Sequence, residues 1–241
     1  MENLILYKSP YEKKRLGKYN DGGYVITLLP GSYDMFLSGG IANDISFEKH
    51  LLFLYPNLIC HAFDGTINVP KRIGNIIFHK QNLGDGTNNT TNLFDYIKPY
   101  NDIFLKIDIE GHEFRIMPVI IESGYIKKIK QIVIEIHSPG DINLYPEYFK
   151  GLGDIDNNKM FSLFKKLNET HTLVHFHANN GCNMQVIDGI NLPHVFELTY
   201  IRNDFVNEKI KNKDPLPTKF DMKNILSKPD YTFSCYPYLD V

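Results

Sequence analysis

Two pairs of ionisable side chains in the middle of the chain have a spacing that could support catalysis. Asp108 and Glu110 follow one apolar run, and Glu135 and His137 lie two residues apart at the end of another. Residues two apart on a strand project to the same face, so these groups can converge. Asp108, Glu135 and His137 predict a site for Mg²⁺ or Mn²⁺. The alternative is that the acids bind cofactor or substrate hydroxyls without a metal.

A third polar group, His177 with Asn179 and Asn180, follows a later apolar run. An alcohol is a poor nucleophile at neutral pH and needs a general base, a metal ion or both. We expect His177 to serve as this base or as a ligand, with Asp108 and His137 as the other catalytic candidates. The candidates for binding substrate are Glu110, Asn179 and Asn180.

A glycine-rich turn, which contains Gly39 and Gly40, follows an earlier apolar run. Such a turn lets the backbone approach a ligand closely, and an acid that ends the next strand, here Asp64, can bind a ribose diol. The turn does not have the spacing of a dinucleotide-binding motif, and Asp44 lies close to it. An acid there repels a pyrophosphate but suits a cationic nucleoside that carries an amino acid. S-adenosylmethionine therefore fits better than NAD, and an ordinary tight turn is the alternative.

The elements that must position these residues alternate along the chain. The pattern predicts strands over 33–37, 58–63, 75–79, 103–107, 129–136, 172–177 and 195–201, and helices over 46–54, 91–97, 111–122 and 159–167. Alternation of this kind predicts a parallel sheet with helices on both faces. Ligands bind beyond the carboxyl ends of such strands, and an acid or amide, such as Asn82, follows almost every predicted strand.

The composition is that of one globular domain of 241 residues, with 43% hydrophobic and 22% charged residues. Residues 1–30 are expected to form an N-terminal cap, and the polar, proline-rich residues 207–241 a tail or lid. The net charge of −2 gives no bulk attraction to nucleic acid or to an anionic membrane. Three distant cysteines cannot make a disulfide framework, and no apolar run approaches the roughly 18 residues of a membrane span. We expect a cytoplasmic protein without a nucleic-acid partner.

Several blocks of the sequence resemble one known family. They are Asp21-Gly22-Gly23-Tyr24, the segment 40–48, Phe63-Asp64-Gly65-Thr66, the segment 106–113, Glu135-Ile136-His137 and the segment 196–200. These blocks resemble the FkbM-like S-adenosylmethionine-dependent O-methyltransferases over about residues 15–202. Ala42 and Gly65 depart from the glycine and the proline that the family usually has there. The resemblance implies an α/β class I methyltransferase (Rossmann-like) fold, with a seven-stranded, mostly parallel sheet whose last strand is antiparallel.

The resemblance also implies an activity, which is O-methylation of a carbohydrate hydroxyl. The acceptor would be a small-molecule sugar, a sugar nucleotide or a surface-polysaccharide precursor. The residues implied to bind the cofactor are Asp21, Tyr24, Gly39, Gly40, Ala42, Asp44, Ser46, Glu48, Asp64, Asn82 and Asp108. The alternative function is a metal-dependent hydrolase that uses Asp108, Glu135, His137 and His177.

Overall fold

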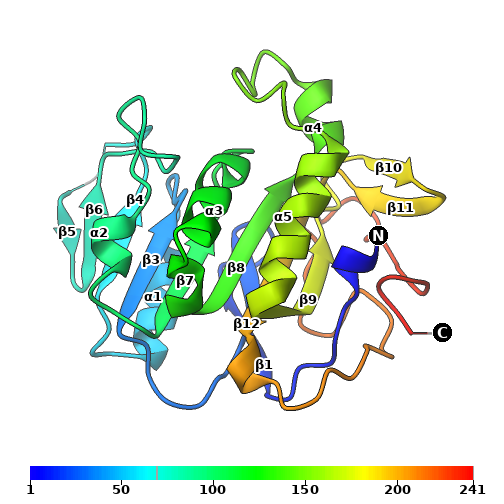
Figure 1. The fold of residues 1–241 in the computed structure, drawn as a ribbon, viewed down its shortest axis with the longest axis horizontal. Coiled ribbons are helices and arrows are strands. Elements are labelled where there is room, and N and C mark those ends of the chain that lie inside the picture. Colours follow the sequence, from blue (N-terminus) through cyan, green and yellow to red (C-terminus); the bar gives the residue numbers. More distant parts are fainter. Residues whose placement is uncertain (69, 241) are drawn as a thin grey trace.

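A computed structural model describes residues 1–68 and 70–240, and its central element is an eight-stranded sheet (Figure 1). The strands are β3 (Met35–Gly39), β4 (Cys60–Phe63), β5 (Arg72–Ile73), β6 (Ile76–His79), β7 (Ile103–Ile107), β8 (Ile129–His137), β9 (His171–Ala178) and β12 (Val195–Arg202). They lie in the order β5-β6-β4-β3-β7-β8-β12-β9. Strands β6, β4, β3, β7 and β8 are parallel, whereas β12 is antiparallel to both of its neighbours.

This topology confirms the predicted α/β class I methyltransferase fold. The last strand of the sheet along the chain, β12, inserts between β8 and β9 and runs against them, as the resemblance implies. The sheet has one strand more than expected, because the two-residue β5 pairs antiparallel with β6 at the edge. The assignment of the fold depends on this strand order.

The central strands are buried on both sides because helices and a hairpin cover the two faces of the sheet. All nine residues of β8 and all five of β7 are buried. Helices α2 (Phe94–Ile97), α3 (Glu113–Glu122) and α5 (Asn157–Thr170) pack on one face, which is the near one in Figure 1. Helix α1 (Ser46–Leu54) covers the other face together with a hairpin of β1 (Lys13–Gly17) and β2 (Gly23–Thr27).

Several elements were not predicted from the sequence. They are the hairpin β1–β2, the hairpin of β10 (Met184–Ile187) and β11 (Ile190–Pro193), the short helix α4 (Pro139–Leu144), and the 3₁₀ turns η1 (Glu2–Leu4), η2 (Tyr125–Lys128) and η3 (Asn203–Phe205). Strand β1 reads Lys-Lys-Arg-Leu-Gly and strand β10 is mostly half-exposed. Neither strand therefore has the apolar alternation that marks a strand in sequence.

The C-terminal segment 207–240 packs as part of the fold along the outer side of β9. Leu216, Phe233 and Tyr238 are all at least 95% buried, and the rings of Phe233 and Tyr238 contact Phe176 of β9. The segment touches the rim of the site through Asn224, whose Nδ2 donates to Asp21 Oδ1 at 3.2 Å. In residues 1–68 and 70–240, none of the helices has the length and apolarity needed to cross a membrane.

Candidate active site

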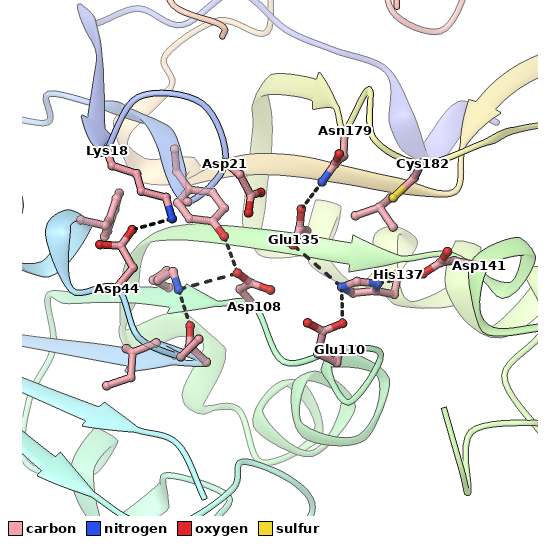
Figure 2. A pocket seen from close by; sticks show the side chains of 18 of the residues that line it. Lys18, Asp21, Asp44, Asp108, Glu110, Glu135, His137, Asp141, Asn179 and Cys182 are labelled. Atoms are coloured by element: carbon pink, nitrogen blue, oxygen red, sulfur yellow. Dashed lines mark hydrogen bonds and ion pairs between the residues drawn. The ribbon is translucent and has the colours of Figure 1, made fainter. Parts of the chain in front are cut away.

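Two adjoining clefts lie at the carboxyl ends of the parallel strands. One has a volume of about 540 Å³ and the other about 430 Å³. Both are lined by the turn after β3 and the loop after β7, which contribute Gly40, Ala42, Asp108 and Glu110. The larger cleft, shown in Figure 2, extends towards β8 and the β1–β2 hairpin, and the smaller one towards the ends of β4 and β6.

The glycine turn lies directly against the end of β7. Gly40 has φ +71°, and a Cβ there would lie 1.5 Å from the carbonyl oxygen of Asp108. Gly39 is also closely packed, because a Cβ would lie 2.2 Å from the Leu83 side chain. No side chain fits at Gly40, so the backbone of the turn can line both clefts. Gly39 supports this turn but is not among the described residues that line either cleft.

Asp64 lies at the end of β4 and binds the glycine turn. Its Oδ2 accepts a hydrogen bond from the amide of Ala42 at 2.9 Å, and its Oδ1 accepts from both the amide and the hydroxyl of Thr66, at 2.8 and 2.6 Å. Ala42 has φ +41°, a left-handed conformation that costs an alanine roughly 1–2 kcal/mol. Asn82 lines the same cleft, and its Oδ1 accepts from the amide of Gly65 at 2.8 Å. The structure thus brings Asp64, predicted to bind the ribose, and Asn82, also predicted to bind the cofactor, into one cleft.

Three further residues predicted to bind the cofactor lie around the start of α1. Asp44 lines the larger cleft, pairs with Lys18 at 3.5 Å and accepts from the Ser46 amide at 3.0 Å. Ser46 lines neither cleft in the described part of the chain, so its predicted cofactor contact is corrected to support of Asp44. Glu48 lies at the base of the larger cleft, where its carboxylate accepts from the Ser38 hydroxyl at 2.6 Å and burial raises its pKa.

The half-buried Asp108 and the buried Glu135 form a pair of carboxyl groups with opposite pKa shifts. Burial opposes ionisation of Asp108, but the Lys106 ammonium at 4.0 Å and the Tyr24 hydroxyl, which donates at 2.5 Å, lower its pKa. Burial and the charge of Asp108 raise the pKa of Glu135 well above its usual range. Asp108 is therefore the stronger acid of the pair, and Glu135 the weaker one. Lys106 also donates to the Gly40 carbonyl at 2.6 Å, so it ties the glycine turn to this charge.

His137 lies among carboxyl groups at the end of β8, and Figure 2 labels Asp108, Glu110, Glu135 and Asp141 around it. Its Nδ1 is 3.0 Å from Asp141 Oδ2, and its Nε2 is 3.3 Å from Glu110 Oε2 and 3.8 Å from Glu135 Oε2. Its backbone amide donates to Glu113 Oε1 at 2.7 Å. Burial would lower the pKa of His137, but the hydrogen bond with Asp141 and the neighbouring acids raise it to about 9. Without a bound cation the imidazole is therefore protonated at neutral pH.

The predicted metal trio is revised by this geometry. Asp108, Glu110 and His137 each offer one ligand atom, and these three atoms lie within 4.8 Å of one another. Glu110 thus takes the place that the sequence prediction gave to Glu135. The loop after β7 causes the change, because Glu110 has φ +55° and this turn brings its carboxylate back towards His137.

The prediction that His177 is the catalytic base is wrong. The side chain is 4% exposed and is not among the described residues that line either cleft. Its Nδ1 is 3.7 Å from Glu197 Oε2 and its Nε2 is 3.7 Å from Asp230 Oδ2. Burial would lower its pKa, but these two acids raise it to about 10. His177 is therefore a buried cation, and the insertion of β12 between β8 and β9 separates it from the cleft.

The two asparagines predicted to bind substrate have different environments. Asn179 lines the larger cleft and its Nδ2 donates to Glu135 Oε1 at 3.4 Å. Asn180 is buried, and both ends of its amide bind the C-terminal segment, including the Ile225 amide at 2.8 Å and the Ile225 carbonyl at 3.0 Å. The predicted role of Asn180 in substrate binding is therefore corrected to anchoring of the tail.

Sequence reasoning did not identify an aromatic wall beside the cleft. Tyr145, Tyr148 and Phe149 follow α4 and line the larger cleft, and the last two also line the smaller one. Tyr145 and Tyr148 are more than half exposed, whereas Phe149 is buried with its ring 5.5 Å from that of His137. Lys18 and Cys182 also line the cleft and were not predicted. A run of aromatic residues after a short, unpredicted helix gives little signal in a single sequence.

No protein-family model and no curated protein sequence matches the chain. Among solved structures, the chain is similar to a fibrillarin–Nop5p complex, with 12% identity, 72% of this chain and 74% of that chain covered, and a TM-score of 0.38. A putative rRNA methylase from Clostridium thermocellum has 9% identity and a TM-score of 0.32, and the match covers 70% of this chain and 86% of that chain. A 16S rRNA adenine-N1 methyltransferase from Catenulisporales acidiphilia, crystallised with S-adenosylmethionine, has 10% identity, coverage of 84% and 100%, and a TM-score of 0.33.

Proposed function

We propose that the protein is an S-adenosylmethionine-dependent O-methyltransferase that acts on a carbohydrate hydroxyl. The acceptor would be a sugar nucleotide or a surface-polysaccharide precursor, as in the FkbM-like family that the sequence resembles. The observation that carries the proposal is the glycine turn between the two clefts. Gly40 packs on the end of β7, and the carboxylate of Asp64 binds the same turn from β4.

The two clefts suit the two halves of this cofactor. Asp64 and Asn82 line the smaller cleft and would hold the ribose and the adenine side. Asp21, Tyr24 and Asp108 line the larger cleft and would hold the amino-acid side, where the negative charge of Asp108 favours a cationic group. When bound, S-adenosylmethionine would supply a methyl group on a sulfonium, and the transfer would depend mainly on positioning of donor and acceptor.

The remainder of the larger cleft would hold the acceptor. Glu110, Glu135 and Asn179 present oxygen and nitrogen atoms that can bind hydroxyl groups, and Tyr145 and Tyr148 present rings against which the apolar face of a sugar can pack. The carboxyl groups of Asp108 and Glu135 line this space side by side, and an ionised carboxylate there would accept the proton of the acceptor hydroxyl. This pair takes over the role predicted for His177. A divalent cation, Mg²⁺ or Mn²⁺, would assist by lowering the pKa of the acceptor hydroxyl.

Calorimetric titration of the full chain with S-adenosylhomocysteine tests the cofactor assignment. We expect saturable binding of one molecule per chain, whereas the hydrolase alternative predicts no heat. A screen with methyl-labelled cofactor against sugar nucleotides and simple glycosides, with and without a chelator, then tests the acceptor class. Label found in protein or RNA substrates but in none of the sugars would overturn the carbohydrate assignment and leave the methyltransferase assignment in place.

A further inference from the structure

We propose that Asp108, Glu110 and His137 bind one divalent cation, and that Asp141 positions His137 for this purpose. The inference deepens the proposed function and depends on it only for the catalytic role of the cation. Binding of the cation itself follows from the arrangement of the side chains and can be measured without the transfer reaction.

The three ligand atoms come from two neighbouring strand ends. Asp108 and Glu110 follow β7, His137 ends β8, and their ligand atoms lie within 4.8 Å of one another. All three residues line the larger cleft, and Figure 2 shows the three side chains converging. The Glu110 side chain is 52% exposed, so the cluster is open to the cleft and a cation can reach it.

The second, independent observation is the state of the His137 ring. The residue is 7% exposed, and its Nε2 points into the acidic cluster, where Glu110 Oε2 lies 3.3 Å away; among the described residues this nitrogen has no partner in hydrogen-bonding geometry. Its Nδ1 is already engaged by Asp141 at 3.0 Å. Histidines that ligate metals usually donate their second ring nitrogen to a carboxylate in this way, which fixes the ring and leaves the other nitrogen free.

Hydrogen bonds and the local backbone conformation also hold the residues of the cluster in place. The amide of His137 donates to the buried Glu113 carboxylate at 2.7 Å, and Tyr24 donates to Asp108 Oδ2 at 2.5 Å. Glu110 has the left-handed φ of +55° that directs its carboxylate towards His137. A site whose ligands are held before binding loses little freedom when the cation arrives.

The donor set indicates which cations fit. Two carboxylate oxygens and one imidazole nitrogen suit Mn²⁺ and Mg²⁺, and three protein ligands leave coordination positions for water and for an oxygen of the acceptor. Glu135 Oε2 lies 3.8 Å from His137 Nε2 and adds to the acidic surroundings. In the proposed reaction the cation would bind the acceptor hydroxyl and lower the pKa of that hydroxyl. The oxidation state of the cation would not change.

Titration of the full chain with MnCl₂, followed by calorimetry and by the electron paramagnetic resonance signal of free Mn²⁺, tests the proposal. We expect one Mn²⁺ per chain, with affinity reduced about tenfold or more in Glu110→Gln and in His137→Ala. Asp141→Asn should weaken Mn²⁺ binding by about 10- to 100-fold, as expected for a residue that orients a ligand. Glu147→Gln is the matched control, because Glu147 lies in the same segment as the aromatic wall but its side chain is 91% exposed and pairs with Lys150.

Parallel titration with S-adenosylhomocysteine and a melting curve for each variant show that the variants are folded. Failure of the wild type to bind Mn²⁺, or equal binding by wild type, Glu110→Gln and His137→Ala, would overturn the cation site and leave an ion pair between Glu110 and His137. If the wild type binds S-adenosylhomocysteine but does not bind Mn²⁺, the cation site is contradicted and the proposed methyltransferase function is not. If the wild type binds Mn²⁺ but does not bind S-adenosylhomocysteine, the proposed methyltransferase function is contradicted and the cation site is supported.

Discussion

Replacement of Asp64 is the most direct test of how this protein would bind its cofactor. The Asp64 carboxylate lines the smaller cleft and accepts three hydrogen bonds, one from Ala42 in the glycine turn and two from Thr66. Asp64→Ala removes the charge that would hold the ribose diol, and it also releases the turn. Asp64→Asn keeps the size and one carbonyl oxygen but removes the charge, so it isolates the electrostatic part.

The expected magnitude follows from the number of interactions lost. A hydrogen bond to a charged group contributes about 1.5–3 kcal/mol. The loss of this interaction with the ribose corresponds to an increase in the Kd for S-adenosylhomocysteine of roughly 10- to 160-fold. Asp64→Ala should lie at the upper end of this range because the Ala42 amide also loses its acceptor, and Asp64→Asn at the lower end.

The chain contains a matched control in a second Asp-Gly-Thr turn. Asp85 accepts from the amide and the hydroxyl of Thr87 at 2.9 and 2.6 Å, which repeats the two contacts between Asp64 and Thr66. Asp85 is exposed and is not among the described residues that line either cleft. Asp85→Ala should therefore leave the Kd unchanged in the same calorimetric titration. An Asp64→Ala protein that is folded and binds S-adenosylhomocysteine as tightly as the wild type would refute the assignment of Asp64.

Three further predictions concern the turn, the buried histidine and the tail. Gly40→Ala should abolish S-adenosylhomocysteine binding and lower Tm, because its Cβ would overlap the Asp108 carbonyl. Gly74→Ala is the control: Gly74 has φ +56° and its Cβ would have no atom within 4 Å, so the substitution should cost only roughly 1–2 kcal/mol of stability. Because the folded-state pKa of His177 is raised from 6.5 to about 10, its ion pairs stabilise the fold fully below pH 6.5, and this stability is lost as the pH rises to about 10. The difference in free energy of unfolding between wild type and His177→Gln, measured in urea, should shrink over that interval, and a constant difference would contradict the assignment. Truncation before residue 211 removes three large buried side chains that each contribute about 1.5–3 kcal/mol. The truncated protein should therefore be unfolded in a melting experiment, and not merely impaired in acceptor use. An unchanged Tm would restore the interpretation of the tail as a lid.

The agreement between sequence and structure is best where the pattern is strong and local. The predicted bounds of α1 and β7 are those observed, because a helical apolar face and a short β-branched or aromatic run are both set by neighbouring residues. The β1–β2 hairpin gave no such signal. Its strand β1 carries three basic residues, and it is held on the sheet by contacts with residues far away in the chain, such as the Gln131 side chain at Thr27.

The sequence by itself determined which residues end the parallel strands, and this was sufficient to place Gly40, Asp64 and Asp108 at one edge of the sheet. Strand ends are a local property, and parallel strands bring their carboxyl ends to the same side. The sequence could not determine which ligand atoms converge, because that depends on the turn at Glu110. It also could not show that β12 separates His177 from the cleft, since β12 pairs with residues of β8 that are 58 to 70 positions away and with residues of β9 that are 18 to 31 positions away. Tertiary structure alone therefore decided that His177 is a buried cation and that Glu110 is the third member of the candidate cation site.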